Sequence, residues 1–267
     1  MKNTQIISVI NQKGGVGKTT TVINLATALS FKDKKVLVID LDPQGNATTG
    51  FGLTNSSEDS KTIYDVLNGG CNFEDAIKDT QIDNLKLISS NVDLSGLEVE
   101  TATENRRAFL LKDKMSSFIK NEKNDFSYIF IDCPPSLSLL TVMALVAAKS
   151  LIVPLQAEFF ALEGLSQLIK TIDRIKVNLN PQLDIRGVLL TMFDKRNKLS
   201  EQVDVEARKF FQNKVYQTVI PRNVRLSEAP SHGEPVLIYD KLCAGSKSYA
   251  RFSEEFLKQE NIMESAA

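Results

Sequence analysis

Short runs of apolar, often β-branched residues alternate with longer amphipathic stretches along this chain. The apolar runs predict strands over 5–10, 35–39, 85–89, 128–131, 150–155, 185–192 and 214–219. The amphipathic stretches predict helices over 19–30, 106–120, 137–148, 162–178, 201–212 and 246–259. Strands that are almost continuously apolar are typical of sheets covered on both faces. The pattern therefore predicts an α/β fold with a mostly parallel central sheet and helices on both faces.

No internal repeat, low-complexity tract or linker rich in Pro, Gly and Ser divides the chain. We expect a single domain over 1–260, a flexible C-terminal tail over 261–267, and a mobile polar loop at 54–61. The first ten residues lack the apolar region and cleavage site of a signal peptide. The longest apolar stretch, 139–148, is about half of the roughly 20 residues that cross a bilayer. We expect a cytoplasmic protein without a transmembrane segment.

Composition and charge narrow the classes of function. A chain of 267 residues with 42% hydrophobic residues can bury a large core, which excludes disorder throughout. Thirty-two basic and thirty-three acidic side chains leave a net charge of −1, so any attraction to nucleic acid must be local. Cys71, Cys133 and Cys243 form no CxxC pair, which favours buried free thiols over a disulfide framework or a zinc ribbon. His232 is the sole histidine, which argues against a histidine zinc site or a Ser-His-Asp triad.

A glycine-rich segment lies between the first predicted strand and the first predicted helix, where a phosphate-binding loop belongs. Its residues are Lys13, Gly14, Gly15, Val16, Gly17, Lys18, Thr19 and Thr20. Glycines let backbone N–H groups turn toward a phosphate, and the helix N-terminus adds partial positive charge. We expect Lys18 to reach the β- and γ-phosphates and the Thr19 hydroxyl to bind Mg²⁺. Gln12 occupies the place of the usual first glycine, and Lys13 beside it could serve its own subunit, a partner subunit or solvent.

Carboxylates follow two of the predicted strands. Asp40 and Asp42 end the second strand, at the sheet edge where ligands bind in open α/β folds. Alternation places both on the same side of the extended chain, so we expect both to face a γ-phosphate; a strand-ending loop without chemistry is the alternative. Asp132 follows the strand at 128–131 and is expected to hold a Mg²⁺-bound water.

These motifs resemble those of the ParA/MinD ATPases. KGGVGKTT at 13–20 resembles their deviant Walker A loop, DLDPQGN at 40–46 matches their switch I motif, and IPRNVRLSEAPS at 220–231 resembles the chromosomal ParA/Soj branch. The resemblance covers almost the whole chain and implies a P-loop NTPase fold with ATP and Mg²⁺ as cofactors. It also implies an ATPase that forms an ATP-bound homodimer, in which Lys13 reaches the nucleotide of the partner subunit.

The resemblance assigns roles to particular residues. Asp42 would position or activate the attacking water, with Lys13 and Lys18 stabilising charge, and Asp40 would couple its loop to the nucleotide and Mg²⁺. The loops after two later strands would frame the adenine, which makes Met192, Pro221, Arg222 and Asn223 the candidates for base contacts.

Charge is unevenly distributed along the chain. Residues 51–108 carry eleven acidic and five basic side chains, whereas 186–225 carry nine basic and four acidic ones. Solvated surface charge explains such a bias equally well from composition alone. The resemblance favours non-specific DNA binding by the ATP-bound dimer on the nucleoid, with Arg196 and Arg225 contacting phosphates. It also implies a ParB-type centromere-binding partner that stimulates hydrolysis. Because the chain opens with the first strand, we expect no N-terminal helix-turn-helix domain.

Three other functions stay open at this point: a MinD-like positioning ATPase on a membrane, a ParA-like ATPase that positions a protein cargo, and a nucleotide-dependent scaffold. Membrane binding is not expected, because segment 252–260 carries three glutamates and one lysine, which anionic lipid would repel. The identity of the cargo is not encoded in these motifs.

Overall fold

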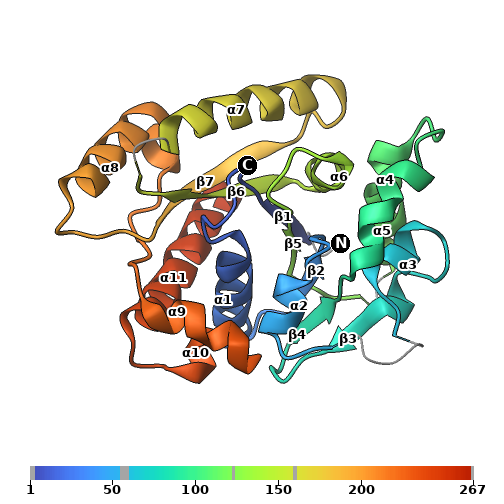
Figure 1. The fold of residues 1–267 in the computed structure, drawn as a ribbon, viewed down its shortest axis with the longest axis horizontal. Helices are drawn as coiled ribbons and strands as arrows, with labels where there is room; N and C mark the ends of the chain where they lie inside the picture. Colours follow the sequence, from blue (N-terminus) through green and yellow to red (C-terminus); the bar gives the residue numbers. More distant parts are fainter. Residues whose placement is uncertain (1–3, 55–59, 122–123, 159–160, 266–267) are drawn as a thin grey trace.

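The computed structural model describes residues 4–54, 60–121, 124–158 and 161–265 (Figure 1). Its strands are β1 (Gln5–Val9), β2 (Val36–Asp40), β3 (Ile77–Asp79), β4 (Leu85–Ile88), β5 (Tyr128–Asp132), β6 (Ser150–Gln156) and β7 (Asp184–Thr191). Its α-helices are α1 (Lys18–Ser30), α2 (Asn46–Gly50), α3 (Ile63–Leu67), α4 (Leu97–Glu100), α5 (Leu110–Lys120), α6 (Leu139–Ala147), α7 (Ala161–Asn178), α8 (Lys198–Phe211), α9 (Val224–Glu228), α10 (Val236–Tyr239) and α11 (Ala244–Ser265). Short 3₁₀ helices are η1 (Glu74–Ala76), η2 (Val92–Gly96), η3 (Arg107–Phe109), η4 (Gln212–Lys214) and η5 (Ala229–His232).

The strands form one sheet in the order β3-β4-β2-β5-β1-β6-β7. All neighbours pair in parallel except β3, which runs antiparallel to β4 at the edge. Parallel register brings the carboxyl ends of β1, β2 and β5 together, because Val9 pairs with Asp132 and Asp132 pairs with Asp40. The predicted mostly parallel α/β architecture is confirmed.

Helices cover both faces of the sheet (Figure 1). Strand alternation sends Val38 toward α1 and α11, where it shares a core with Leu25 and Phe256. The preceding residue, Leu37, points to the other face of the sheet and packs in a core with Met143 of α6. A third core lies between β6, β7 and the helices α7 and α8. Near-complete burial of these strands explains why their sequences are almost continuously apolar.

Most predicted elements are confirmed, with boundaries moved by a few residues. The predicted helix over 106–120 is shorter, because its first turn is the separate η3 and α5 begins at Leu110. The last helix, α11, runs past its predicted end at 259 to Ser265. The predicted mobile loop at 54–61 lies largely outside the described residues. The division into a domain over 1–260 and a flexible tail stays a prediction.

One predicted strand is wrong, and one strand was not predicted. Residues 214–219 do not form a strand, and the segment makes a single isolated bridge from Val215 to Val188. The reason is that the backbone N–H groups of Gln217 and Thr218 donate to the Glu255 carboxylate of α11, at 2.6 and 2.8 Å, instead of to a neighbouring strand. The edge strand β3 was missed because its three residues include two charged ones and show no apolar run.

Within the described part of the chain, no helix combines the length and the apolar character needed to cross a membrane. Its cysteines Cys71, Cys133 and Cys243 are free thiols, as predicted. The expected burial is found only at Cys133, which is completely buried, whereas Cys71 and Cys243 are partly exposed.

Candidate functional site

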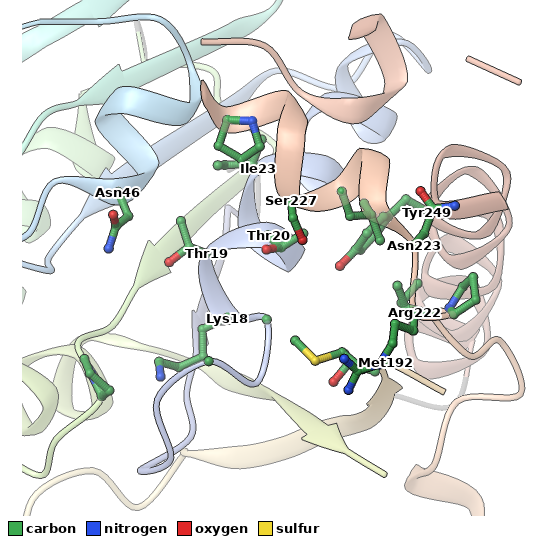
Figure 2. A pocket seen from close by; sticks show the side chains of 18 of the residues that line it. Lys18, Thr19, Thr20, Ile23, Asn46, Met192, Arg222, Asn223, Ser227 and Tyr249 are labelled. Carbon is green, nitrogen blue, oxygen red and sulfur yellow. The ribbon is translucent and has the colours of Figure 1, made fainter. Parts of the chain in front are cut away.

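A cavity of about 530 Å³ opens at the carboxyl edge of the sheet, around the N-terminus of α1. This volume is typical of small-molecule sites, which range over about 300–1,000 Å³. Figure 2 shows Lys18, Thr19 and Asn46 on one side of the α1 N-terminus and Met192, Arg222 and Asn223 on the other. The lining residues are Gly15, Gly17, Lys18, Thr19, Thr20, Ile23, Asp42, Asn46, Thr49, Pro135, Thr191, Met192, Ile220, Pro221, Arg222, Asn223, Leu226, Ser227, Pro230 and Tyr249.

The glycine-rich loop has the backbone geometry of an anion site. Gly15 and Gly17 have φ values of +73° and +89°, in the left-handed region that glycine adopts without strain. Gly17 is the N-cap of α1, and no side-chain cap or first-turn acid occupies that helix end in the described residues. The first N–H groups of a helix have no partner within the helix. They are therefore available, together with the helix dipole, to a phosphate in the cavity.

The two lysines of the loop have different surroundings. Lys18 is buried, lines the cavity and donates from Nζ to the carbonyl of Lys13 at 3.1 Å. Burial lowers the pKa of Lys18, and the negative charge of Asp132 opposes that change. Lys13 is half-exposed, lies outside the cavity lining, and pairs with Glu158 at 2.8 Å between Nζ and Oε2. Lys18 is therefore placed for a ligand in its own chain, whereas the ammonium group of Lys13 points elsewhere.

Asp40 and Asp42 do not face the cavity together, in contrast to the geometry expected from alternation. Asp42 lines the cavity, and its Oδ1 accepts a hydrogen bond from the backbone N–H of Gln44 at 3.0 Å. Asp40 is completely buried beneath the loop, and its Oδ2 accepts from both the N–H and the hydroxyl of Thr48, at 2.8 and 2.7 Å. Burial raises the pKa of Asp40 to about 6, against the opposing effect of these hydrogen bonds. The chain turns after Asp40, so strand alternation does not extend to Asp42.

Asp132 lies next to Asp40 at the end of the adjacent strand and is completely buried. Neither of its carboxylate oxygens has a hydrogen-bond partner of normal geometry among the described residues. Burial and the charge of Asp40 raise the pKa of Asp132 well above its usual range, and the nearby Thr19 hydroxyl acts in the opposite direction. Buried carboxylates ordinarily have partners. A buried carboxylate that has no well-formed hydrogen bond among the described residues, beside a threonine hydroxyl, fits a hydrated divalent cation. The described residues hold no cluster of three or more His, Cys, Asp or Glu side chains that could bind a metal unaided.

The far side of the cavity is formed by the segments after β7 and before α9. Met192 adopts a positive φ of +50°, and the next residue, Phe193, forms a bridge with Pro221. The side chain of Asn223 caps α9 by accepting from the N–H of Arg225 at 3.1 Å. The four predicted base-contact residues, Met192, Pro221, Arg222 and Asn223, all line this cavity.

A second hollow, of about 930 Å³, lies on the outer side of the same segments. Its described lining residues include five cations, Lys195, Arg196, Arg222, Lys247 and Arg251, together with Asp194. We call this hollow the basic groove. The Arg196 guanidinium donates to both carboxylate oxygens of Asp194, at 3.1 and 3.0 Å, and is otherwise exposed. Arg225 lines neither hollow and pairs with Glu228 at 2.7 Å and with Asp240 at 3.5 Å.

Several residues of these sites carried no clear signal in the sequence. Tyr249 belongs to α11 and reaches the cavity from 228 residues beyond Thr21, with which it shares a hydrogen bond of 3.2 Å. Lys247 and Arg251 come from the same helix and lie outside the basic segment recognised from composition. Thr48 is the hydrogen-bond partner of Asp40, and the sequence pointed to Thr48 only through its position two residues after the switch I motif.

The chain is similar to known proteins over nearly its whole length. Residues 4–185 match the family model described as an AAA domain. The chain is 50% identical over 263 residues to the chromosome partitioning protein ParA of Caulobacter vibrioides, covering 98% of this chain and 97% of that protein. It is 47% identical over 251 residues to the sporulation initiation inhibitor protein Soj of Bacillus subtilis, covering 94% of this chain and 97% of that protein. Cobyrinic acid a,c-diamide synthase of Mycobacterium smegmatis, solved with a bound ATP analogue and magnesium, has a TM-score of 0.83 and 32% identity, covering 96% of this chain and 94% of that one.

Proposed function

The chain belongs to the ParA/Soj family of chromosome-partitioning ATPases, and from that premise we propose that it segregates DNA through an ATP-dependent cycle of dimerisation and DNA binding. It is an ATPase whose cofactors are ATP and Mg²⁺. The observation that carries the proposal is the cavity at the N-terminus of α1, which Lys18, Thr19 and Asp42 line together.

The triphosphate of ATP occupies the phosphate loop, with Lys18 and the first N–H groups of α1 against its β- and γ-oxygens. The adenine lies on the far side of the cavity, against Met192 and the segment that contains Pro221, Arg222 and Asn223. Thr19 and the buried carboxylate of Asp132 are the residues that would hold hydrated Mg²⁺. Bound Mg²⁺ neutralises negative charge that develops on the phosphates.

Asp42 acts on the nucleophile of the hydrolysis. It is the acid that lines the cavity beside Lys18 and Thr19, so its free carboxylate oxygen can accept a hydrogen bond from a water molecule near the γ-phosphate. Holding that water in line with the bond to be broken lowers the barrier by positioning. Lys18 stabilises the negative charge that the transferred phosphoryl group carries.

Lys13 contributes to the site of the second subunit in the ATP-bound homodimer. In the single chain its ammonium group lies outside the cavity lining and is held by Glu158 at 2.8 Å. Exposed ion pairs of this kind are worth about 0.2–1 kcal/mol, so a nucleotide phosphate of the partner subunit can displace Glu158 at small cost. ATP then favours the dimer because both subunits bind its phosphates in that state.

The basic groove supports the DNA-binding part of the proposal. It concentrates cations from three separate segments of a chain whose net charge is only −1. We propose that Arg196 within the groove and Arg225 nearby contact DNA phosphates without reading the bases. A ParB-type partner bound to centromere-like sites stimulates hydrolysis and so releases the dimer from the nucleoid.

Sedimentation of the purified chain tests this function. The chain is mixed with fragmented non-specific DNA or with anionic liposomes, in ATP, ADP or no nucleotide, at low and moderate salt. We expect binding to DNA that requires ATP and weakens with salt, and no binding to liposomes. Binding to liposomes instead would place the chain with the MinD-like positioning ATPases, and binding to neither would favour an ATPase whose cargo is a protein.

A further inference from the structure

A continuous chain of hydrogen bonds runs from the end of β4 to the loop that carries Asp42. The N–H of Ser90 donates to the Thr48 hydroxyl oxygen at 3.1 Å, and that hydroxyl donates to Oδ2 of Asp40 at 2.7 Å. The other carboxylate oxygen, Oδ1 of Asp40, accepts from the N–H of Asp42 at 3.2 Å. Asp42 in turn accepts from the N–H of Gln44 at 3.0 Å. This series of hydrogen bonds therefore connects Ser90, which does not line the cavity, to Asp42, which does.

The direction of each bond is set by the chemistry of the groups. A backbone N–H can only donate, so the Thr48 hydroxyl accepts from Ser90 and its single proton is directed to Asp40. A hydroxyl that both accepts and donates in this way has one orientation. Thr48 is almost completely buried, so water does not compete for these bonds.

Asp40 depends strongly on Thr48. Its carboxylate is fully buried beside Asp132, and a buried carboxylate is stabilised by the donors that surround it. Of the three hydrogen bonds that Asp40 accepts in the described structure, Thr48 donates two, through its N–H and its hydroxyl. Both donors meet the same oxygen, Oδ2, which leaves Oδ1 directed at the N–H of Asp42.

We propose that Thr48 is a positioning residue for ATP hydrolysis: its hydroxyl orients Asp40, and Asp40 holds the backbone of Asp42 so that the Asp42 carboxylate faces the attacking water. This inference rests on the proposed function, in which Asp42 acts on that water. Thr48 does not line the nucleotide cavity. Its contribution therefore belongs to the chemical step and not to nucleotide affinity.

The test compares Thr48→Val with Thr48→Ser in the full-length chain. Valine keeps the shape of threonine but removes the hydroxyl, whereas serine keeps the hydroxyl and removes the methyl group. For Thr48→Val we expect kcat to fall about tenfold or more while KM for ATP changes less than about twofold, because misplacing a reacting group by about 1 Å costs up to about a hundredfold in rate. For Thr48→Ser we expect kcat within about threefold of the unaltered chain, because the hydrogen bond to a charged group is kept.

The matched control is Thr27→Val, which also removes a buried threonine hydroxyl. That hydroxyl donates to the carbonyl of Ile23 within α1, at 2.8 Å, and lies outside the cavity lining. We expect kcat of Thr27→Val to change less than about twofold, as for most substitutions away from a functional network. Thermal unfolding of all three variants shows whether the substitutions leave the fold intact.

Each outcome supports or contradicts the inference. If Thr48→Val keeps the kcat of the unaltered chain, Thr48 has no positioning role. The same conclusion follows if both Thr48→Val and Thr48→Ser lose kcat and ATP affinity. If Thr48→Val does not fold, the serine variant decides the question, because a large loss of kcat in Thr48→Ser despite normal unfolding contradicts a role for the hydroxyl. Asp42→Ala separates the two proposals: normal turnover in Asp42→Ala would refute the proposed role of Asp42 itself, whereas a dead Asp42→Ala beside a fully active Thr48→Val would refute only the positioning role.

Discussion

Replacing Arg225 tests the proposed contact with DNA directly. Arg225 lies outside the nucleotide cavity, so its removal leaves the residues around ATP in place. Its guanidinium pairs with Glu228 at 2.7 Å and with Asp240 at 3.5 Å in the single chain, and half of its side chain is exposed. Exposed ion pairs of this kind contribute about 0.2–1 kcal/mol each, so they do not prevent the guanidinium from turning to a phosphate.

The magnitude of the effect follows from the number of contacts. In the proposed DNA-bound dimer one guanidinium of each protomer contacts one phosphate, so Arg225→Ala should remove two phosphate contacts. Each lost contact reduces the slope of log K against log salt by about 0.9, which is about 1.8 for the dimer. A fourfold rise in salt concentration should therefore lower the DNA affinity of the unaltered chain about tenfold more than it lowers the DNA affinity of Arg225→Ala. Arg225→Glu should bind more weakly still, because its new charge repels DNA.

The assay is fluorescence anisotropy of a labelled random-sequence duplex titrated with protein in ATP and Mg²⁺ at several salt concentrations. Lys120→Glu is the matched control, because it makes the same change in net charge as Arg225→Glu at the exposed end of α5, on the other face of the sheet. ATP turnover without DNA should be unchanged in every variant. An Arg225→Ala variant with the affinity and salt slope of the unaltered chain would refute the contact.

Five other substitutions or treatments probe the site and the core. Asp42→Ala should abolish phosphate release yet keep ATP-dependent dimers, which a phosphate assay and size-exclusion chromatography report; normal turnover would contradict its role. Lys18→Ala should lose nucleotide binding measured by calorimetry, whereas Lys13→Ala should keep nucleotide binding and lose the ATP-dependent dimer seen by analytical ultracentrifugation. Complete burial raises the pKa of the Cys133 thiol, so iodoacetamide should label Cys133 only after denaturation, as read by mass spectrometry of its peptide. Phe256→Ala removes a fully buried ring between α11 and the sheet and should lower the free energy of unfolding by about 3–5 kcal/mol in a urea titration, while a loss below about 1 kcal/mol would contradict the packing.

The strands and helices that the hydrophobic pattern predicted are those whose burial is nearly uniform. β2 and β5 are fully buried along their length, and their apolar runs were unmistakable. Segment 214–219 carries the β-branched and aromatic residues typical of strands, but the backbone N–H groups of Gln217 and Thr218 donate to Glu255 of α11. A prediction from local pattern cannot include a competing acceptor that lies about forty residues away in the chain.

The candidate site was predicted in part. Gly15, Gly17, Lys18 and Thr19 line one cavity, and the four base-contact candidates line its far side, while the binding of ATP by these residues stays a prediction. Alternation placed Asp40 and Asp42 together, whereas the turn after β2 separates them and buries Asp40 against Thr48. The roles of these residues in hydrolysis stay predictions.

The phosphate loop was determined by the sequence alone, because its function depends on local properties: glycines that adopt positive φ and the helix that begins directly after them. The sheet order, the orientation of Asp40 away from the cavity, and the ion pair of Lys13 with Glu158 were decided by the tertiary structure. The basic groove was also decided by the tertiary structure. Its cations come from three segments that together span more than fifty residues, and they meet only when α11 packs beside the loops after β7. Contacts between distant segments depend on how the chain closes on itself, and no local pattern of polar and apolar residues encodes that closure.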